Sequence, residues 1–318
     1  MGGTTTVIVP TTSPEKAARL LASLADSAGG FETIVVDNGT GDPELDRAGS
    51  MLREFTVLRL DSHLGYSRAV NLAARRAKGD ALVLLNDDSV VDPGYVERLT
   101  ERLDPARGVV MTAGVMRDAR NPRVIETAGI ELDGTLLAFD YLNGEPVSVL
   151  DGRVADPIGP SGAVAAFERD AFLEAGGFDE NLFAYLEDVD LALRLRMGGA
   201  SCSLAADARG THEHSGTLGS GSARKDYLMG YGRGYLLRKW SVLTPRRIPG
   251  VLARELTWIA GQTLVDRNLG GVRGRASGLR AARRAEPYPA EALSNPPSLA
   301  ATLRRRWRRR ARLRRSAD

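Results

Sequence analysis

The chain of 318 residues has a single cysteine, Cys202, and three histidines. One cysteine excludes an intramolecular disulfide and any metal site built from several thiolates. We expect Cys202 to be a small buried hydrophobic side chain. No run of about 18 apolar residues occurs, so the sequence predicts no transmembrane helix. The opening segment, MGGTTTVIVP, has no basic region and no cleavage site, and we therefore expect a cytoplasmic protein without a secretory signal.

Lysine is missing from residues 245–318, although this segment holds 18 arginines and only five acidic residues. Its formal charge is +13, whereas the preceding 244 residues hold 25 basic and 35 acidic side chains, a charge of −10. An acidic body with a basic end indicates two roles on one chain. The acidic body also argues against a nucleic-acid-binding protein, and we expect no nucleic acid as a partner.

Short apolar strands alternate with amphipathic helices over the first hundred residues. The expected strands cover residues 5–10, 31–36, 55–60 and 81–85, and the expected helices cover residues 67–77 and 93–103, with another beginning at Thr12–Glu15. This alternation predicts an α/β fold with a mostly parallel sheet and helices on its faces. Ligands bind such sheets beyond the carboxyl ends of the strands. Three polar clusters follow expected strands: Thr11–Thr12, Asp37–Asn38 and Asn86–Asp88.

The composition changes after about residue 237. Residues 109–166 are mixed, with short β-like pieces, and residues 170–199 are helical with an internal loop. Residues 251–265 form another expected helix, followed by a segment rich in glycine and arginine and then a proline-rich stretch. We therefore predict one α/β domain over residues 1–237 and a helical, basic extension over residues 238–318.

The last segment, residues 298–315, is a candidate cationic helix. Leu299, Leu303 and Trp307 are spaced four residues apart on one face, and nine arginines lie between residues 304 and 315. This pattern is typical of a helix on an anionic membrane surface. Two other interpretations stay open, namely contact with nucleic-acid phosphates and a solvated, disordered tail.

Asn86-Asp87-Asp88 follows the apolar run ALVLL. A carboxylate at a strand end can hold a hard divalent cation that neutralises the charge on a leaving diphosphate. Asp88 is the expected ligand, with Asp87 beside it, and a simple turn is the alternative. At the end of the second expected strand, Asp37 can accept the imide N–H of uracil or thymine, although Asn38-Gly39 is also a common turn dipeptide.

Two further clusters contain acids or histidines. Glu187, Asp188 and Asp190 lie among apolar residues, and one carboxylate there can serve as a general base for an acceptor hydroxyl. The alternative is a solvated first turn of a helix, where acidic side chains suit the dipole. His212 and His214 are separated by one residue, and a neutral imidazole is a common metal ligand, although an exposed loop is equally compatible.

Taken in order, the segments VIVPTTS, VVDNGT, HLGYSRAVNLAARRAKGDALVLLNDDSVVDPG, GPSGAVAAFERDAFLEAGGFDENLFAYLEDVDLALRLRMGG and THEHS resemble glycosyltransferase family 2, whose members are inverting and have the GT-A fold. The similarity runs from about residue 6 to residue 215 and is nearest to the rhamnosyltransferase-like branch. It implies an enzyme that uses Mn²⁺ or Mg²⁺ and a dTDP- or UDP-sugar. The implied acceptor is a hydroxyl, which a polyprenyl-linked cell-surface glycan at the membrane can supply.

The resemblance also implies roles for individual residues. Asp188 is the expected base with Glu187 beside it, and Asp88 and His212 are the expected metal ligands. The expected donor-binding residues are Pro10, Thr11, Asp37, Asn38, Arg68, Asn71, Asn86 and Asp87. The expected acceptor region contains Gly162 and Tyr185.

Some residues depart from the family pattern. Asn86 stands where the first acid of the metal-binding triplet often lies, and PTTS replaces an aromatic residue and an asparagine. Either His212 or His214 can match the metal-binding histidine of the family, and we favour His212. A nucleotide-sugar-binding protein or a nucleotidyltransferase is the alternative class. A nucleotidyltransferase would be expected to have a glycine-rich loop with arginine or lysine after the first strand, where this chain has Thr11-Thr12-Ser13-Pro14.

Overall fold

The computed structural model describes residues 4–25, 30–162, 164–212 and 222–289. His214 and the expected helix over residues 298–315 lie outside these residues. The chain divides into two compact units. The first unit contains Met1–Glu131, Asp140–Phe183 and Asp188–His214, and the second contains Leu132–Phe139, Ala184–Glu187 and Ser215–Asp318. The division into domains at residue 237 stays a prediction.

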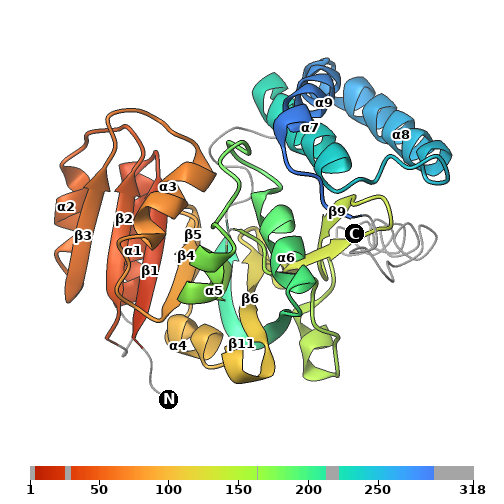
Figure 1. The fold of residues 1–318 in the computed structure, drawn as a ribbon. Helices are drawn as coiled ribbons and strands as arrows, with labels where there is room; N and C mark the ends of the chain where they lie inside the picture. Colours follow the sequence, from red (N-terminus) through yellow and green to blue (C-terminus); the bar gives the residue numbers. More distant parts are fainter. Residues whose placement is uncertain (1–3, 26–29, 163, 213–221, 290–318) are drawn as a thin grey trace. The chain divides into compact units, whose positions relative to one another are not determined.

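A nine-stranded mixed sheet forms the centre of the first unit (Figure 1). Its strands follow the order β3-β2-β1-β4-β10-β6-β11-β5, and β7 pairs with β6. The strand bounds are β1 (Thr5–Thr11), β2 (Glu32–Asp37), β3 (Glu54–Arg59), β4 (Ala81–Leu85), β5 (Ser89–Val91), β6 (Val109–Asp118), β7 (Asn121–Thr127), β10 (Val164–Glu168) and β11 (Ser201–His212). A separate two-stranded ribbon contains β8 (Ile130–Leu132) and β9 (Ala138–Asp140).

The first four strands of the sheet are parallel, as the alternating pattern predicts. The later strands are mixed, because β10 pairs antiparallel with both β4 and β6. Val164, the first residue of β10, lies opposite Leu85, the last residue of β4. The start of β10 therefore lies at the sheet edge where the four parallel strands end.

Helices cover both faces of this sheet (Figure 1). They are α1 (Pro14–Ala25), α2 (Glu44–Gly49), α3 (Tyr66–Ala74), α4 (Tyr95–Thr100), α5 (Arg169–Glu174) and α6 (Glu187–Met197). One apolar core contains side chains from α1, α2 and α4, and the other contains side chains from α3, α5 and α6. The three leucines that define the apolar face of α1, Leu20, Leu21 and Leu24, are fully buried, and Cys202 is buried as expected.

The second unit contains three longer helices, α7 (Ala223–Lys239), α8 (Ile248–Asp266) and α9 (Gly270–Ala281). Short 3-10 turns elsewhere cover Pro105–Arg107, Val147–Asp151 and Ala282–Arg284. Within the described ranges, every helix is too short or too polar to cross a bilayer. The expected helix over residues 251–265 corresponds to α8.

The sequence pattern did not predict α9, because its glycines favour irregular structure. These glycines instead allow α9 to pack closely against α7. A Cβ at Gly274 would lie 2.1 Å from the Tyr227 carbonyl oxygen, and one at Gly278 would lie 2.0 Å from that of Tyr231. Gly230 and Gly234 of α7 meet the backbone of α9 in the same way. Glycine is thus required by the close backbone approach.

Gly278→Ala is expected to lower the free energy of unfolding by about 1–3 kcal/mol, because the added methyl group overpacks the contact between α7 and α9. The matched control is Gly261→Ala in α8, where an added Cβ meets nothing within 4 Å. That change should be neutral or stabilising by up to about 1 kcal/mol, since alanine favours helix more than glycine does. Urea denaturation of both variants provides the comparison, and equal stabilities would contradict this packing.

Candidate active site

The polar cluster after β4 begins with a tight turn. The Ser89 N–H donates to the Asn86 carbonyl oxygen at 3.1 Å, which reverses the chain and starts β5. β5 then pairs antiparallel with β11, and this register sets His212 opposite Ser89. The turn and the register together bring His212 beside Asp88.

Asp88, His212 and Glu126 form a buried row. His212 Nε2 lies 2.9 Å from Asp88 Oδ1, and His212 Nδ1 lies 2.9 Å from Glu126 Oε1. Asp88 and His212 face each other without the angles of a hydrogen bond, although both atoms are buried. Burial alone would lower the pKa of His212, but the adjacent carboxylates of Asp88 and Glu126 raise it to about 10.

Asp87 points toward β1. The Thr11 hydroxyl, at the end of that strand, donates to Asp87 Oδ2 at 2.6 Å. Burial raises the pKa of Asp87 and outweighs the effects of the Thr11 hydrogen bond and the Lys16 charge, which lower it. Pro10 is buried in the same strand opposite Val36.

A small pocket of about 60 Å³ opens beside this cluster. Its walls are formed by Arg19, Asp87, Asp88, Ser89, Val90, Ala119, Thr211 and His212. The pocket therefore combines two carboxylates and an imidazole with the side chain of one arginine. This combination suits an anion held together with a cation.

Asp188 is the second residue of α6 and is held at the start of β10. The Gly162 N–H donates to Asp188 Oδ2 at 2.9 Å, and the Tyr66 hydroxyl donates to the Gly162 carbonyl oxygen. Gly162 lies two residues before Val164, which pairs with Leu85, so Asp188 and Asp88 share one edge of the sheet. Burial raises the pKa of Asp188 more than its backbone hydrogen bonds lower it.

Asp37 and Asn38 are buried at the end of β2 and are engaged with nearby backbone. Asp37 accepts hydrogen bonds from the Thr40 N–H at 2.8 Å and the Gly41 N–H at 3.0 Å. The Asn38 amide contacts the segment before α3, with its Nδ2 donating to the Gly65 carbonyl oxygen. The structure thus contains the turn that the sequence offered as the alternative, and a role for these residues in binding a base stays a prediction.

Arg68 and Asn71 lie on α3 and both contact Glu180. Arg68 Nε donates to Glu180 Oε2 at 2.9 Å. The Asn71 amide accepts from the Phe178 N–H at 2.9 Å and donates to the Phe178 carbonyl oxygen at 2.8 Å. Asn71 therefore fixes the segment before α6, and neither residue lines the pocket beside Asp88.

Glu187 and Tyr185 belong to the second unit. Glu187 is the first residue of α6 and is buried, and Tyr185 has a left-handed backbone with φ of 72°. A left-handed conformation is costly for a bulky residue and is often found near functional sites. Their roles as a catalytic and an acceptor-binding residue stay predictions.

Sequence reasoning missed Glu126, Lys16 and Arg19. Glu126 is on β7, in the mixed region where no strand pattern was clear, and it meets His212 only through the pairing of β6 with β7 and β11. Lys16 and Arg19 lie on the first helix, where charged side chains ordinarily indicate a solvated face. No pattern in the sequence distinguishes these three residues from surface charges.

A mixed sheet of this order, with helices on both faces, is the GT-A fold. Two solved structures share the fold. One is GalNAc-T7 with UDP, GalNAc and Mn²⁺, at 16% identity and a TM-score of 0.59, over 75% of this chain and 48% of that chain. The other is the mannosyltransferase PcManGT of Pyrobaculum calidifontis in complex with GDP-Man and Mn²⁺. It is 19% identical with a TM-score of 0.53, over 92% of this chain and 78% of that chain.

The chain belongs to glycosyltransferase family 2 and is a transferase enzyme: the model "Glycosyl transferase family group 2" matches residues 81–269, and "Glycosyl transferase family 2" matches residues 6–140. This membership agrees with the resemblance drawn from the motifs and excludes the nucleotidyltransferase alternative.

Curated relatives are similar to parts of the chain. The O-antigen biosynthesis protein RfbC of Myxococcus xanthus is 27% identical over 63% of this chain. The N-acetylglucosaminyl-diphospho-decaprenol L-rhamnosyltransferase of Mycobacterium tuberculosis is 28% identical over 57% of it. The matches span only 16% of the first relative and 66% of the second.

Asn71→Ala is expected to lower the free energy of unfolding by about 1–3 kcal/mol, because the buried N–H of Phe178 loses its acceptor. Asn181→Ala serves as the control, since Asn181 is exposed and its amide donates to neighbouring Asp179. Chemical denaturation measures both. Unchanged stability of Asn71→Ala together with weaker binding of a nucleotide sugar would assign Asn71 to the donor site instead.

Proposed function

We propose that this enzyme transfers a sugar from a dTDP- or UDP-activated donor to an acceptor hydroxyl, with inversion at the anomeric carbon. The observation that carries the proposal is the shared sheet edge, where Asp88 follows β4, His212 ends β11 beside it, and Asp188 is bound to Gly162 before β10. One edge thus offers a place for a diphosphate and a base for an incoming hydroxyl.

Asp88 and His212 would hold a divalent cation, Mn²⁺ or Mg²⁺. Their facing atoms are buried, close together and not aligned as a hydrogen bond, which fits two ligands that converge on an ion. Glu126 on the other ring nitrogen matches the carboxylate that commonly orients a metal-binding histidine. The described residues contain no group of three or more side chains that could hold a metal ion, so phosphate oxygens and water would have to supply the remaining ligands. When bound, the cation neutralises charge on the departing diphosphate.

Asp188 would accept the proton of the acceptor hydroxyl. The hydroxyl oxygen then forms a bond to C1 of the sugar while the bond from C1 to the diphosphate oxygen breaks on the opposite face. A nucleoside diphosphate leaves with the electron pair of that bond. The raised pKa of Asp188 makes its carboxylate a stronger base than an exposed aspartate. Thr11, Asp87, Lys16 and Arg19 surround the region where the donor nucleotide would lie.

Rhamnose is the donor sugar that the relatives favour, and a polyprenyl-linked glycan is the favoured acceptor. The Mycobacterium tuberculosis relative is named for L-rhamnosyl transfer to a diphospho-decaprenol, and the Myxococcus xanthus relative for O-antigen biosynthesis. A cell-wall or surface glycan assembled at the inner face of the membrane would suit the arginines between residues 304 and 315, which attract anionic lipid.

Asp188→Asn is expected to reduce turnover by about 10²–10⁴-fold, because the amide cannot accept the hydroxyl proton. Binding of the nucleotide sugar, measured by calorimetry, should be retained. In the native enzyme, kcat/KM should fall as the pH drops through the pKa of Asp188, which burial raises above 3.8. Below that pKa the carboxyl group is protonated and cannot accept the hydroxyl proton. Glu174→Gln, an exposed acid-to-amide change, is the control. Turnover at the native rate in Asp188→Asn would show that Asp188 is not the catalytic base.

Glu126→Gln is expected to weaken binding of the metal ion by about 10–100-fold, because His212 loses the carboxylate that orients it. Thermal shift measures this as the Mn²⁺ concentration needed to stabilise the protein in the presence of a dTDP- or UDP-sugar. The same screen, repeated across sugars and bases, identifies the donor. Stabilisation by a nucleotide sugar that is independent of Mn²⁺ and Mg²⁺ would contradict the metal site while leaving the donor site in place.

A further inference from the structure

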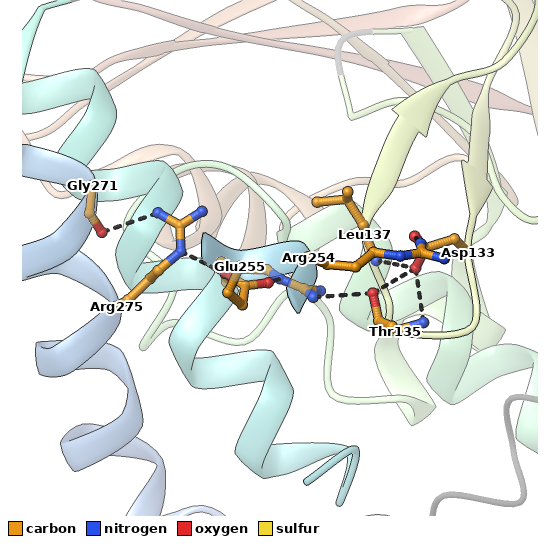
Figure 2. A network of polar contacts seen from close by, with 8 residues as sticks. Asp133, Thr135, Leu137, Arg254, Glu255, Gly271 and Arg275 are labelled. Atoms are coloured by element: carbon orange, nitrogen blue, oxygen red, sulfur yellow. Dashed lines mark hydrogen bonds and ion pairs between the residues drawn. The ribbon is translucent and has the colours of Figure 1, made fainter. Parts of the chain in front are cut away.

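α8 has its polar side chains on its buried side. Between Gly250 and Val265 the only charged residues are Arg254 and Glu255. Glu255 is 8% exposed and accepts from Arg233 Nε at 2.7 Å and Arg275 Nε at 2.6 Å (Figure 2). Arg254 is paired with Asp133, which is 2% exposed. The charges of this helix are therefore taken up inside the second unit.

Two further polar side chains of α8 form hydrogen bonds within the protein. Gln262 Nε2 donates to Asp226 Oδ1 at 2.7 Å, and Asp226 is buried. The exposed hydroxyl of Thr257 donates to the carbonyl oxygen of Ala253, four residues earlier on the same helix. The outer surface of α8 therefore offers few polar groups to water.

The exposed side of α8 is apolar. Leu256 is 66% exposed, Leu264 78% and Val265 79%. Leu252 and Trp258 of the same helix are also exposed, as are Leu269 and Val272 after its end. Helices on the surface of water-soluble domains have the reverse arrangement, with charged residues outside. A continuous apolar face of this kind indicates a contact with something other than water.

We propose that the outer face of α8 lies in the interface of an anionic lipid bilayer. The flanking charge supports this occupant, because the exposed arginines Arg246, Arg267 and Arg273 stand on either side of α8 in the chain, and residues 245–318 carry +13 in total. Basic residues beside an apolar helical face are typical of helices that rest on negatively charged headgroups. With 19 residues and no span of sufficient hydropathy, α8 would lie along the surface.

A second copy of the chain is a poorer occupant of the same face. Two identical surfaces flanked by arginine would repel each other, and this face offers few hydrogen-bonding groups that could specify a protein partner. The bilayer contact is also separate from the glycosyl transfer proposed above, because none of its residues has a role in that chemistry.

The test is flotation of the full chain with phosphatidylcholine vesicles that contain or lack phosphatidylglycerol. Leu256→Glu/Leu264→Glu is expected to weaken binding to the anionic vesicles by about tenfold or more, because two carboxylates must leave water or face like charge. Met51→Glu, at an exposed methionine of the first unit, is the matched control and should bind as the native chain does. A third variant replaces the nine arginines of residues 304–315 with glutamine.

The outcomes separate the alternatives. Loss of binding in the α8 variant, with the far-ultraviolet circular dichroism and sugar transfer to a soluble acceptor unchanged, supports the proposal. The proposal is overturned if the α8 variant binds vesicles as the native chain does. It is also overturned if only the arginine variant loses binding. A change from dimer to monomer in light scattering with no effect on vesicle binding also overturns it and assigns the face to a second copy.

Trp258 gives a second measurement that leaves α8 unaltered. Trp240 is fully buried, so in a Trp307→Phe background Trp258 is the exposed tryptophan that reports on the helix surface. Its emission should shift to shorter wavelength on anionic vesicles and be quenched by brominated acyl chains. Emission that does not change when the protein floats with vesicles would overturn the proposal.

Discussion

The antiparallel insertion of β10 between β4 and β6 is the constraint on which the site depends. It turns the chain so that Gly162 lies near the end of β4, where Asp87 and Asp88 begin the turn into β5. Asp188 then reaches the same edge through one hydrogen bond to the Gly162 backbone. Asp88 and Asp188 are a hundred positions apart in the chain. They share this edge because the register of strand pairing fixes where each segment lies.

Three largely buried carboxylates lie at this edge, which is an electrostatically unfavourable arrangement. Asp87 interacts with Asp88, and one imidazole contacts the carboxylates of Asp88 and Glu126. Burying charges costs several kcal/mol for each ion unless partners compensate. The raised pKa values of His212 and Asp87 reflect this cost, because protonation of either group lowers the negative charge at this edge. The divalent cation proposed for this site would offset part of this cost.

The second unit uses charge differently. Glu255 of α8 accepts hydrogen bonds from the buried Arg233 and Arg275, and Arg254 is paired with Asp133, so that polar contacts help to hold α8 in place (Figure 2). α7 and α9 pack against each other through glycines that let their backbones approach closely, whereas the first unit packs through large apolar side chains. Both features leave apolar side chains available for the outer surface.

From the sequence we could predict the parallel first half of the sheet, the buried leucines of α1 and the candidates Asp88, Asp188 and His212, because periodicity and strand-end polar clusters involve neighbouring residues. We could not predict the direction of β10, the contact of Glu126 with His212, the helix α9 or the inverted orientation of α8. Each of these depends on pairing or packing between segments far apart in the chain. A glycine, a glutamate or an arginine has no local signature that reveals whether its partner is water or another buried group.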